Sequence, residues 1–249
     1  MIQDPAFYAV AIFAVIMTGI AKSGFGGGIA VLAVPLMSIT ISPIQAAGIL
    51  LPLLCLMDVF ALWHYRNRWD KRNLVILLPA AVLGILIGSF TFSYLSDGVV
   101  RILVGVISIA FVAHYFFWRN SPKVIKPKLV SGGFWGALSG FTSFGVHAGG
   151  PPLSIYLLPQ RMEKSLMVGT TVIFFTIVNL VKLIPYGILG QLSSENLMTS
   201  LILSPLAPLG IFLGVQVQKV FSEKLFYRLC YFFLFVAGTK LLLQGLGEV

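Results

Sequence analysis

The sequence predicts an all-α, polytopic integral membrane protein, and three observations lead to this fold class. Of the 249 residues, 58% are apolar and only 10% are charged, whereas soluble globular domains carry about 25% charged residues. The mean hydropathy is +0.96. The apolar runs are long and lack the alternating polar residues of a membrane β-barrel, so helices must satisfy the backbone in lipid. This composition excludes a soluble enzyme.

Charged residues and clusters of Gly, Pro, Asn and Ser divide the chain into apolar segments within one membrane domain, 1–249. The predicted segments are, in chain order, 5–21, 28–41, 44–65, 73–94, 99–118, 130–146, 150–160, 165–187, 197–218 and 225–244. Three of them, 28–41, 130–146 and 150–160, are shorter than the roughly 20 residues that a straight span needs. Each of the three borders a glycine-rich break, so we expect half-helices or re-entrant segments there.

The distribution of Lys and Arg predicts the orientation of the chain. Thirteen cations gather in four connections, namely Arg66, Arg68, Lys71, Arg72, Arg119, Lys123, Lys126, Lys128, Arg161, Lys164, Lys219, Lys224 and Arg228. Positive charge is retained on the cytoplasmic side, which places these connections inside, including the basic connection 119–129. The other connections and both termini carry mainly acidic residues and are predicted to lie outside. The net charge of +9 therefore reflects topology and a lipid bilayer partner, and we expect no nucleic-acid partner.

This orientation requires two helical hairpins, because 5–42 and 130–163 must each begin and end on one side of the membrane. The hairpins occupy matching places in two halves, 5–118 and 130–244. We therefore predict two inverted repeats of about five helical segments each, an arrangement found in many secondary transporters. An offset of 121 residues aligns Gly24 with Gly145, Gly28 with Gly149, Gly48 with Gly169 and Asp58 with Asn179.

Both hairpins contain a glycine-rich break that is suited to an anion. In the run from Lys22 to Gly28, glycines allow the helix to unwind, and the helix that resumes would point its amino end at the break. The matching break, 139–152, adds hydroxyl and imidazole donors. The predicted substrate-binding residues are Lys22, Ser23, Gly24, Gly26, Gly27, Gly28, Thr142, Ser143, His147, Gly149, Gly150, Pro151 and Asn179. The alternative for both breaks is tight helix packing through small residues.

Ionisable residues inside the spans are few, and such residues are functional candidates by default. Asp58 is a candidate for coupling, or else forms a structural ion pair with Lys22 or Lys182. Lys182 itself lies near the outer third of its segment, where we expect its side chain to snorkel to the interface. No catalytic residue, metal ligand set or cofactor is predicted, because no metal-ligand spacing and no phosphate-binding motif occurs.

The chain resembles the sulfite exporter TauE/SafE family, also called the toluenesulfonate-uptake permeases. The resemblance lies in the Lys22-Ser23-Gly24 run that extends to Gly28, in Gly149-Gly150-Pro151-Pro152, in the short length and in the two-fold repeat. It implies transport of a small sulfur-containing or organic anion, such as sulfite, a sulfonate or sulfoacetate, across a bacterial inner membrane. In that membrane, the orientation predicted from the charges places both termini in the periplasm.

The function predicted from these observations is that of a secondary transporter, a permease with alternating access at a site between the two hairpins. One rival is a passive anion channel built from paired half-helices. Another is a membrane partner that passes a sulfur species to an enzyme through Cys55 or Cys230. A homo-oligomer and a coupling ion, either a proton or sodium, are left open.

Overall fold

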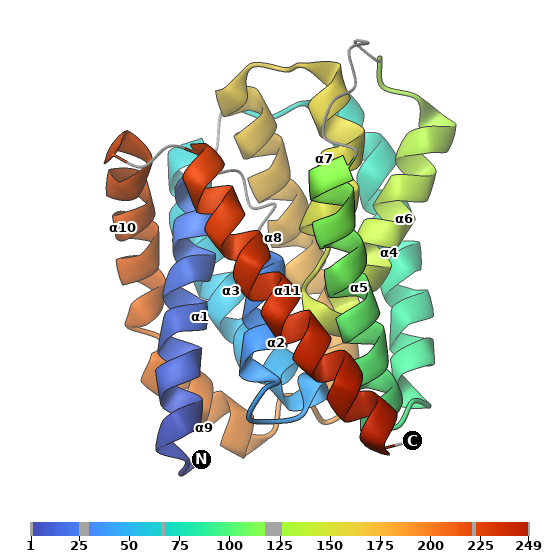
Figure 1. Cartoon of the computed structure of the whole chain (residues 1–249). Coiled ribbons are helices and arrows are strands. Elements are labelled where there is room, and N and C mark those ends of the chain that lie inside the picture. Colours follow the sequence, from blue (N-terminus) through green and yellow to red (C-terminus); the bar gives the residue numbers. More distant parts are fainter. Residues whose placement is uncertain (1, 25–29, 66–67, 118–125, 221–222, 249) are drawn as a thin grey trace.

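The computed structural model describes residues 2–24, 30–65, 68–117, 126–220 and 223–248, and this part of the chain is all-helical (Figure 1). The elements are α1 Pro5–Gly24, η1 Ala30–Leu32, α2 Ala33–Met37, α3 Pro43–Tyr65, α4 Lys71–Ser93, α5 Asp97–Phe117, α6 Leu129–Val146, α7 Gly150–Leu157, η2 Leu158–Gln160, α8 Lys164–Ile188, α9 Ser194–Leu203, α10 Leu206–Val220 and α11 Glu223–Glu248. The predicted all-α class is confirmed.

Within the described residues, six helices, α1, α3, α4, α5, α8 and α11, are long and apolar enough to cross a membrane. The pair α9 and α10 adds a seventh candidate span, which is bent by 41°. The continuous segment predicted at 197–218 is therefore wrong: the helix breaks at Ser204 and Pro205. Proline has no backbone N–H to continue the helical hydrogen bonds and its ring crowds the preceding turn, which explains the break.

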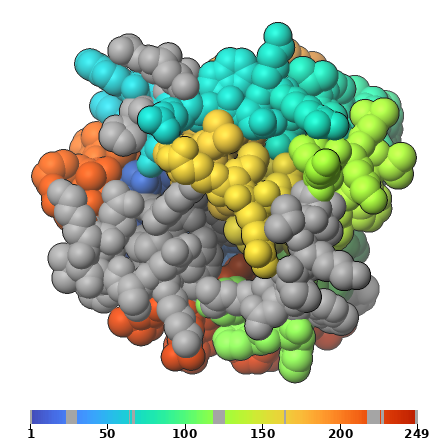
Figure 2. All heavy atoms as spheres, turned by 90° about the horizontal axis from the view of Figure 1, so that it is seen from above, coloured from blue at the N-terminus to red at the C-terminus, as the bar shows by residue number. Residues whose placement is uncertain are grey.

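The connections between the helices gather at two ends of the bundle (Figure 1). Connections 68–70, 126–128 and 161–163 share one end, here called the basic end, where Arg68 and Glu163 form an exposed ion pair at 3.4 Å. Connections 38–42, 94–96 and 189–193 lie at the opposite end, together with the start of α1 and the end of α11. Figure 2 views the basic end, where the yellow segment between α7 and α8 packs against the turquoise start of α4.

Helices α6 and α7 form a hairpin that enters and leaves at the basic end (Figure 1). A Cβ atom on Gly132, near the start of α6, would lie 2.8 Å from the Tyr156 hydroxyl near the end of α7. The two helices therefore run antiparallel and meet at a break around His147. Helices α1 and α2 also run in opposite directions (Figure 1). Of the break predicted in the run from Lys22 to Gly28, residues 22–24 belong to α1 and residues 25–28 lie outside the described residues.

Glycines set the closest helix contacts in the bundle. A Cβ atom on Gly140 of α6 would lie 2.1 Å from the Ala81 carbonyl oxygen of α4. A Cβ atom on Gly19 of α1 would lie 2.8 Å from backbone atoms of Gly210 in α10. Such small residues let two backbones touch, which is typical of helix association in lipid. These contacts fix α1 and α6, the two helices that carry the predicted breaks, against α10 and α4.

Candidate functional site

Lys22 and Asp58 form a buried ion pair between α1 and α3. The Lys22 Nζ atom lies 2.6 Å from Asp58 Oδ1 and donates to the Leu54 carbonyl oxygen at 3.2 Å. The second carboxylate oxygen, Asp58 Oδ2, accepts from Asn179 Nδ2 of α8 at 2.7 Å. Of the two pairings considered for Asp58, the structure contains the one with Lys22. Asp58 and Asn179, which the 121-residue offset aligned, are in direct contact.

Lys182 is fully buried, with 0% of its surface exposed. Its Nζ atom donates to the carbonyl oxygen of Ser143 at 3.0 Å and to the hydroxyl of Ser143 at 3.1 Å. It also lies 2.7 Å from His147 Nδ1. The prediction that Lys182 snorkels to the interface is wrong, because its helix face turns inward, where α6 supplies acceptors. Lys182 follows Asn179 by three residues and so shares its helix face, a signal that the sequence contained.

His147 ends α6 in the left-handed conformation, with φ 53°. Its Nε2 atom lies 3.0 Å from the Ala47 carbonyl oxygen of α3. A carbonyl oxygen only accepts, so the hydrogen-bond pattern assigns the ring proton to Nε2 and leaves Nδ1 as the acceptor for Lys182. His147 is therefore neutral in this arrangement, and it connects the break to both α3 and α8. A left-handed residue other than glycine costs about 1–2 kcal/mol, which these contacts offset.

Local hydrogen bonds hold the break between α6 and α7. Thr142 Oγ1 lies 2.9 Å from the carbonyl oxygen of Leu138 and 3.0 Å from that of Ala148, the two acceptors within reach of its single proton, and Ser139 Oγ donates to Gly149 O at 2.7 Å. The Thr142 hydroxyl, predicted to contact substrate, is thus engaged by its own backbone. A Cβ atom on Gly149 would lie 2.7 Å from the Ser139 carbonyl oxygen, so the packing alternative applies at Gly149.

The remaining predicted residues are Gly150, Pro151, Gly24, Gly26, Gly27, Gly28 and Ser23. Gly150 and Pro151 are buried at the start of α7, next to the break. Gly24 is the last residue of α1, whereas Gly26, Gly27 and Gly28 lie outside the described residues.

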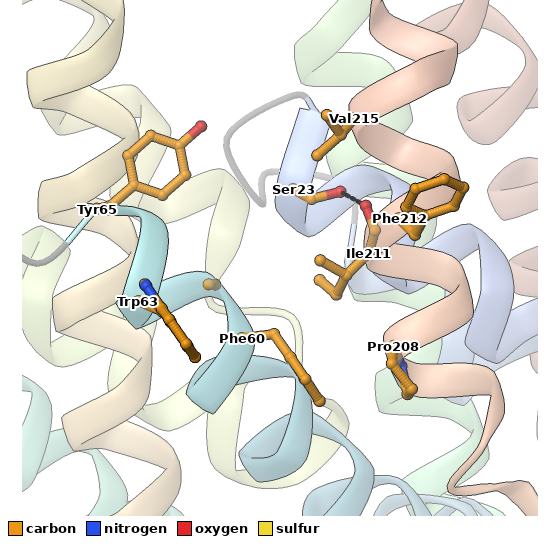
Figure 3. A pocket seen from close by; sticks show the side chains of 9 residues that line it. Ser23, Phe60, Trp63, Tyr65, Pro208, Ile211, Phe212 and Val215 are labelled. Carbon is orange, nitrogen blue, oxygen red and sulfur yellow. Dashed lines mark hydrogen bonds between the residues drawn. The ribbon is translucent and has the colours of Figure 1, made fainter.

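Ser23 contacts α10. Its Oγ atom donates to the Ile211 carbonyl oxygen of α10 at 2.9 Å (Figure 3).

A cavity of about 350 Å³ lies beside Ser23, between α3 and α10 (Figure 3). It is lined by Ser23, Phe60, Ala61, Trp63, Tyr65, Pro208, Ile211, Phe212 and Val215. Ala61 follows Asp58 by three residues on the same helix, but Lys22 and Asp58 are not among the residues that line the cavity. No feature of the sequence predicted this cavity.

Together these residues form a polar centre that holds the buried Lys and Asp side chains of the described residues. We call Lys22, Asp58, Ser143, His147, Asn179 and Lys182 the central cluster. With His147 neutral, its formal charges are two positive and one negative. Charged residues inside a membrane are costly and commonly mark solute pathways. Buried charges at a helix break within a polytopic helical bundle are features of the transporter class.

Comparison with known families agrees with this class. The model of the family described as sulfite exporter TauE/SafE matches residues 11–241. The chain belongs to this family, and it is a membrane transporter rather than an enzyme. The resemblance found in the sequence is thereby confirmed. Comparison with curated proteins and with solved structures gave no match.

Proposed function

We propose that this chain is a secondary transporter that moves a small sulfur-containing or organic anion across the bacterial inner membrane through the central cluster. One observation carries the proposal: Lys182 is completely buried, and within the described residues its Nζ atom contacts only neutral acceptors. A buried cation without a carboxylate partner is costly in a protein interior. An anionic solute beside Lys182 would remove that cost.

The pairing of helices supports the proposed inverted repeats, 5–118 and 130–244. If α1 corresponds to α6 and α4 to α10, then the repeat relates two observed helix contacts to each other. These are the packing of α1 on α10 and the packing of α6 on α4. Helix α3 packs on α8 and α5 on α11, and each of these pairs would join an element to its own counterpart. Such two-fold packing suits a carrier in which one half rocks against the other.

Side-chain amides join the two proposed halves at both ends of the bundle. At the basic end, Asn73 and Gln160 exchange two hydrogen bonds, at 2.9 Å and 3.1 Å. At the opposite end, Gln45 Nε2 donates to Asn196 Oδ1 at 3.4 Å. In alternating access, one of these two contacts opens while the other stays closed.

The orientation follows from the charge distribution. The basic end carries Arg68, Lys71 and Arg72, so the positive-inside rule favours a cytoplasmic basic end and periplasmic termini. Asp58 remains the candidate for coupling. Its carboxylate contacts Lys22 and Asn179, and a proton or sodium ion would have to compete with these partners.

Reconstitution into liposomes tests the proposal. We expect saturable sulfite uptake that is accelerated by sulfite inside the vesicles, and we expect Lys182→Gln to lose it. Lys240→Gln is the matched control, because Lys240 is exposed on α11 and outside the central cluster. Uptake that rises linearly with concentration and shows no exchange would instead support the passive channel. A complete absence of flux, for every sulfur anion and carboxylate tested, would overturn the proposal.

A further inference from the structure

The charge of the central cluster specifies the charge of the solute, an inference that rests on the proposed function. Lys22 and Asp58 compensate each other, since their charged atoms are 2.6 Å apart and both side chains are buried. Lys182 has no such partner among the described residues. Its three contacts are the carbonyl and the hydroxyl of Ser143 and the Nδ1 atom of His147. These match the three donors of an ammonium group.

The other titratable groups near Lys182 do not supply the missing negative charge. Cys55 of α3 is a free thiol, and a thiol is neutral unless its environment activates it. Tyr186 of α8 donates its hydroxyl to the Phe144 carbonyl oxygen, which requires a protonated phenol. Asp58, the carboxylate of the cluster, is already paired with Lys22. With Lys182 protonated, the described cluster therefore holds one more positive charge than its carboxylate balances.

We propose that the central cluster selects singly charged oxyanions, such as a sulfonate, hydrogensulfite or a carboxylate, over doubly charged ones. A monoanion beside Lys182 brings the net charge of the cluster to zero. A dianion would leave one buried negative charge without a partner, and such a charge is strongly disfavoured in a low-dielectric interior. A solute that exists in both forms is therefore carried in its singly charged form.

Ser143 supplies the second contact that an oxyanion needs. Its hydroxyl oxygen accepts from Lys182 at 3.1 Å, which leaves the hydroxyl proton able to donate. Ser143 precedes the left-handed His147 by one helical turn, so the hydroxyl and the ammonium converge at the break. An oxyanion that replaces one of the three present acceptors of Lys182 would receive one charged hydrogen bond from the ammonium and one neutral hydrogen bond from the hydroxyl, and the charged bond is the stronger.

Methanesulfonate and sulfate provide matched probes, because both have a tetrahedral sulfur centre but differ by one unit of charge. Binding is measured as the rise in thermal stability of the detergent-purified protein, at constant ionic strength with the same background chloride. The wild-type protein should bind methanesulfonate more tightly than sulfate by at least about tenfold. Lys182→Gln should lose this binding, whereas Lys182→Arg, which keeps the charge, should retain part of it.

Asp58→Asn provides the sharper test, because it raises the formal charge of the cluster by one. We expect its preference to shift toward sulfate by at least about tenfold. Size-exclusion chromatography checks that each variant is folded, and Lys240→Gln should keep the wild-type preference. If Asp58→Asn does not fold, the wild-type preference still decides the question.

Two results would contradict the inference, and they differ in what else they contradict. Equal affinity for the two probes, in a protein that transports anions, overturns the selection of monoanions and leaves the proposed function intact. Absence of both binding and transport for every anion overturns the proposed function as well.

Discussion

The two buried lysines of the central cluster differ in their partners. Lys22 of α1 contacts a carboxylate and the Leu54 carbonyl oxygen of α3. Lys182 of α8 contacts a serine and a neutral histidine at the break after α6. Both therefore join a hairpin helix to a neighbouring span, but only Lys22 is charge-compensated within the described residues. Lys22 therefore serves the structure, whereas we propose that Lys182 binds the solute.

Removing one member of the compensated pair should have the largest effect on stability. We expect Asp58→Leu to lower the free energy of unfolding by about 3–5 kcal/mol, because Lys22 is left as a second buried cation without a partner. Lys182→Met should cost less, since it removes an uncompensated charge, yet it should abolish transport. Denaturant titration in mixed micelles and uptake into liposomes measure the two effects. Equal destabilisation by the two variants would contradict the distinction between the lysines.

A double variant sharpens the same comparison. Replacing both partners of a buried ion pair by apolar residues is often nearly neutral. We therefore expect Lys22→Met combined with Asp58→Leu to recover most of the stability that Asp58→Leu loses alone. The double-mutant cycle gives the coupling energy of the pair. A coupling energy near zero would mean that the contribution of Lys22 to the free energy of unfolding does not depend on Asp58.

The packing of α6 on α4 positions the acceptors of Lys182. A substitution at Gly140 tests the importance of this packing. A Cβ atom there would lie 2.1 Å from the Ala81 carbonyl oxygen, so Gly140→Ala should destabilise the protein by about 1–3 kcal/mol. It should also weaken transport, because Ser143 and His147 move with α6. Gly133→Ala on the same helix is the control, since a Cβ atom there meets nothing within 4 Å. A similar loss in both variants would point to helix propensity or local flexibility instead of packing.

Much of the fold could be predicted from the sequence, because apolar length and glycine-rich breaks are local signals. The lysine at 182 was misassigned for a physical reason: a lysine in the outer third of a span can snorkel or turn inward, and neighbouring helices decide which. The break at Ser204 and Pro205 was missed although proline marks it, because the flanking residues are apolar enough for one continuous span.

The contacts of the candidate site were harder to predict than its location. The repeat offset aligned Asp58 with Asn179, but an alignment of halves does not predict that the two residues touch. Ser23 and Thr142 lie in the predicted hairpins, yet their hydroxyls donate to the Ile211 and Ala148 carbonyl oxygens. Hydroxyl groups compete locally for backbone acceptors, and only the folded structure reveals which acceptor is within reach.

The smallest effect is expected at the two cysteines, and it tests whether a thiol contributes to the chemistry beside the lysines. Cys55 is an electrostatic neighbour of both Lys22 and Lys182, whereas Cys230 lies buried in α11. An anion held by Lys182 and Ser143 needs no thiol, so Cys55→Ala combined with Cys230→Ala should leave the rates of sulfite and methanesulfonate uptake unchanged. A protein that passes sulfur to an enzyme would behave differently, because sulfite can react with an oxidised thiol and methanesulfonate cannot. Loss of sulfite uptake alone would therefore favour sulfur transfer through a cysteine, whereas equal rates for both anions would leave Lys182 as the group that recognises the solute.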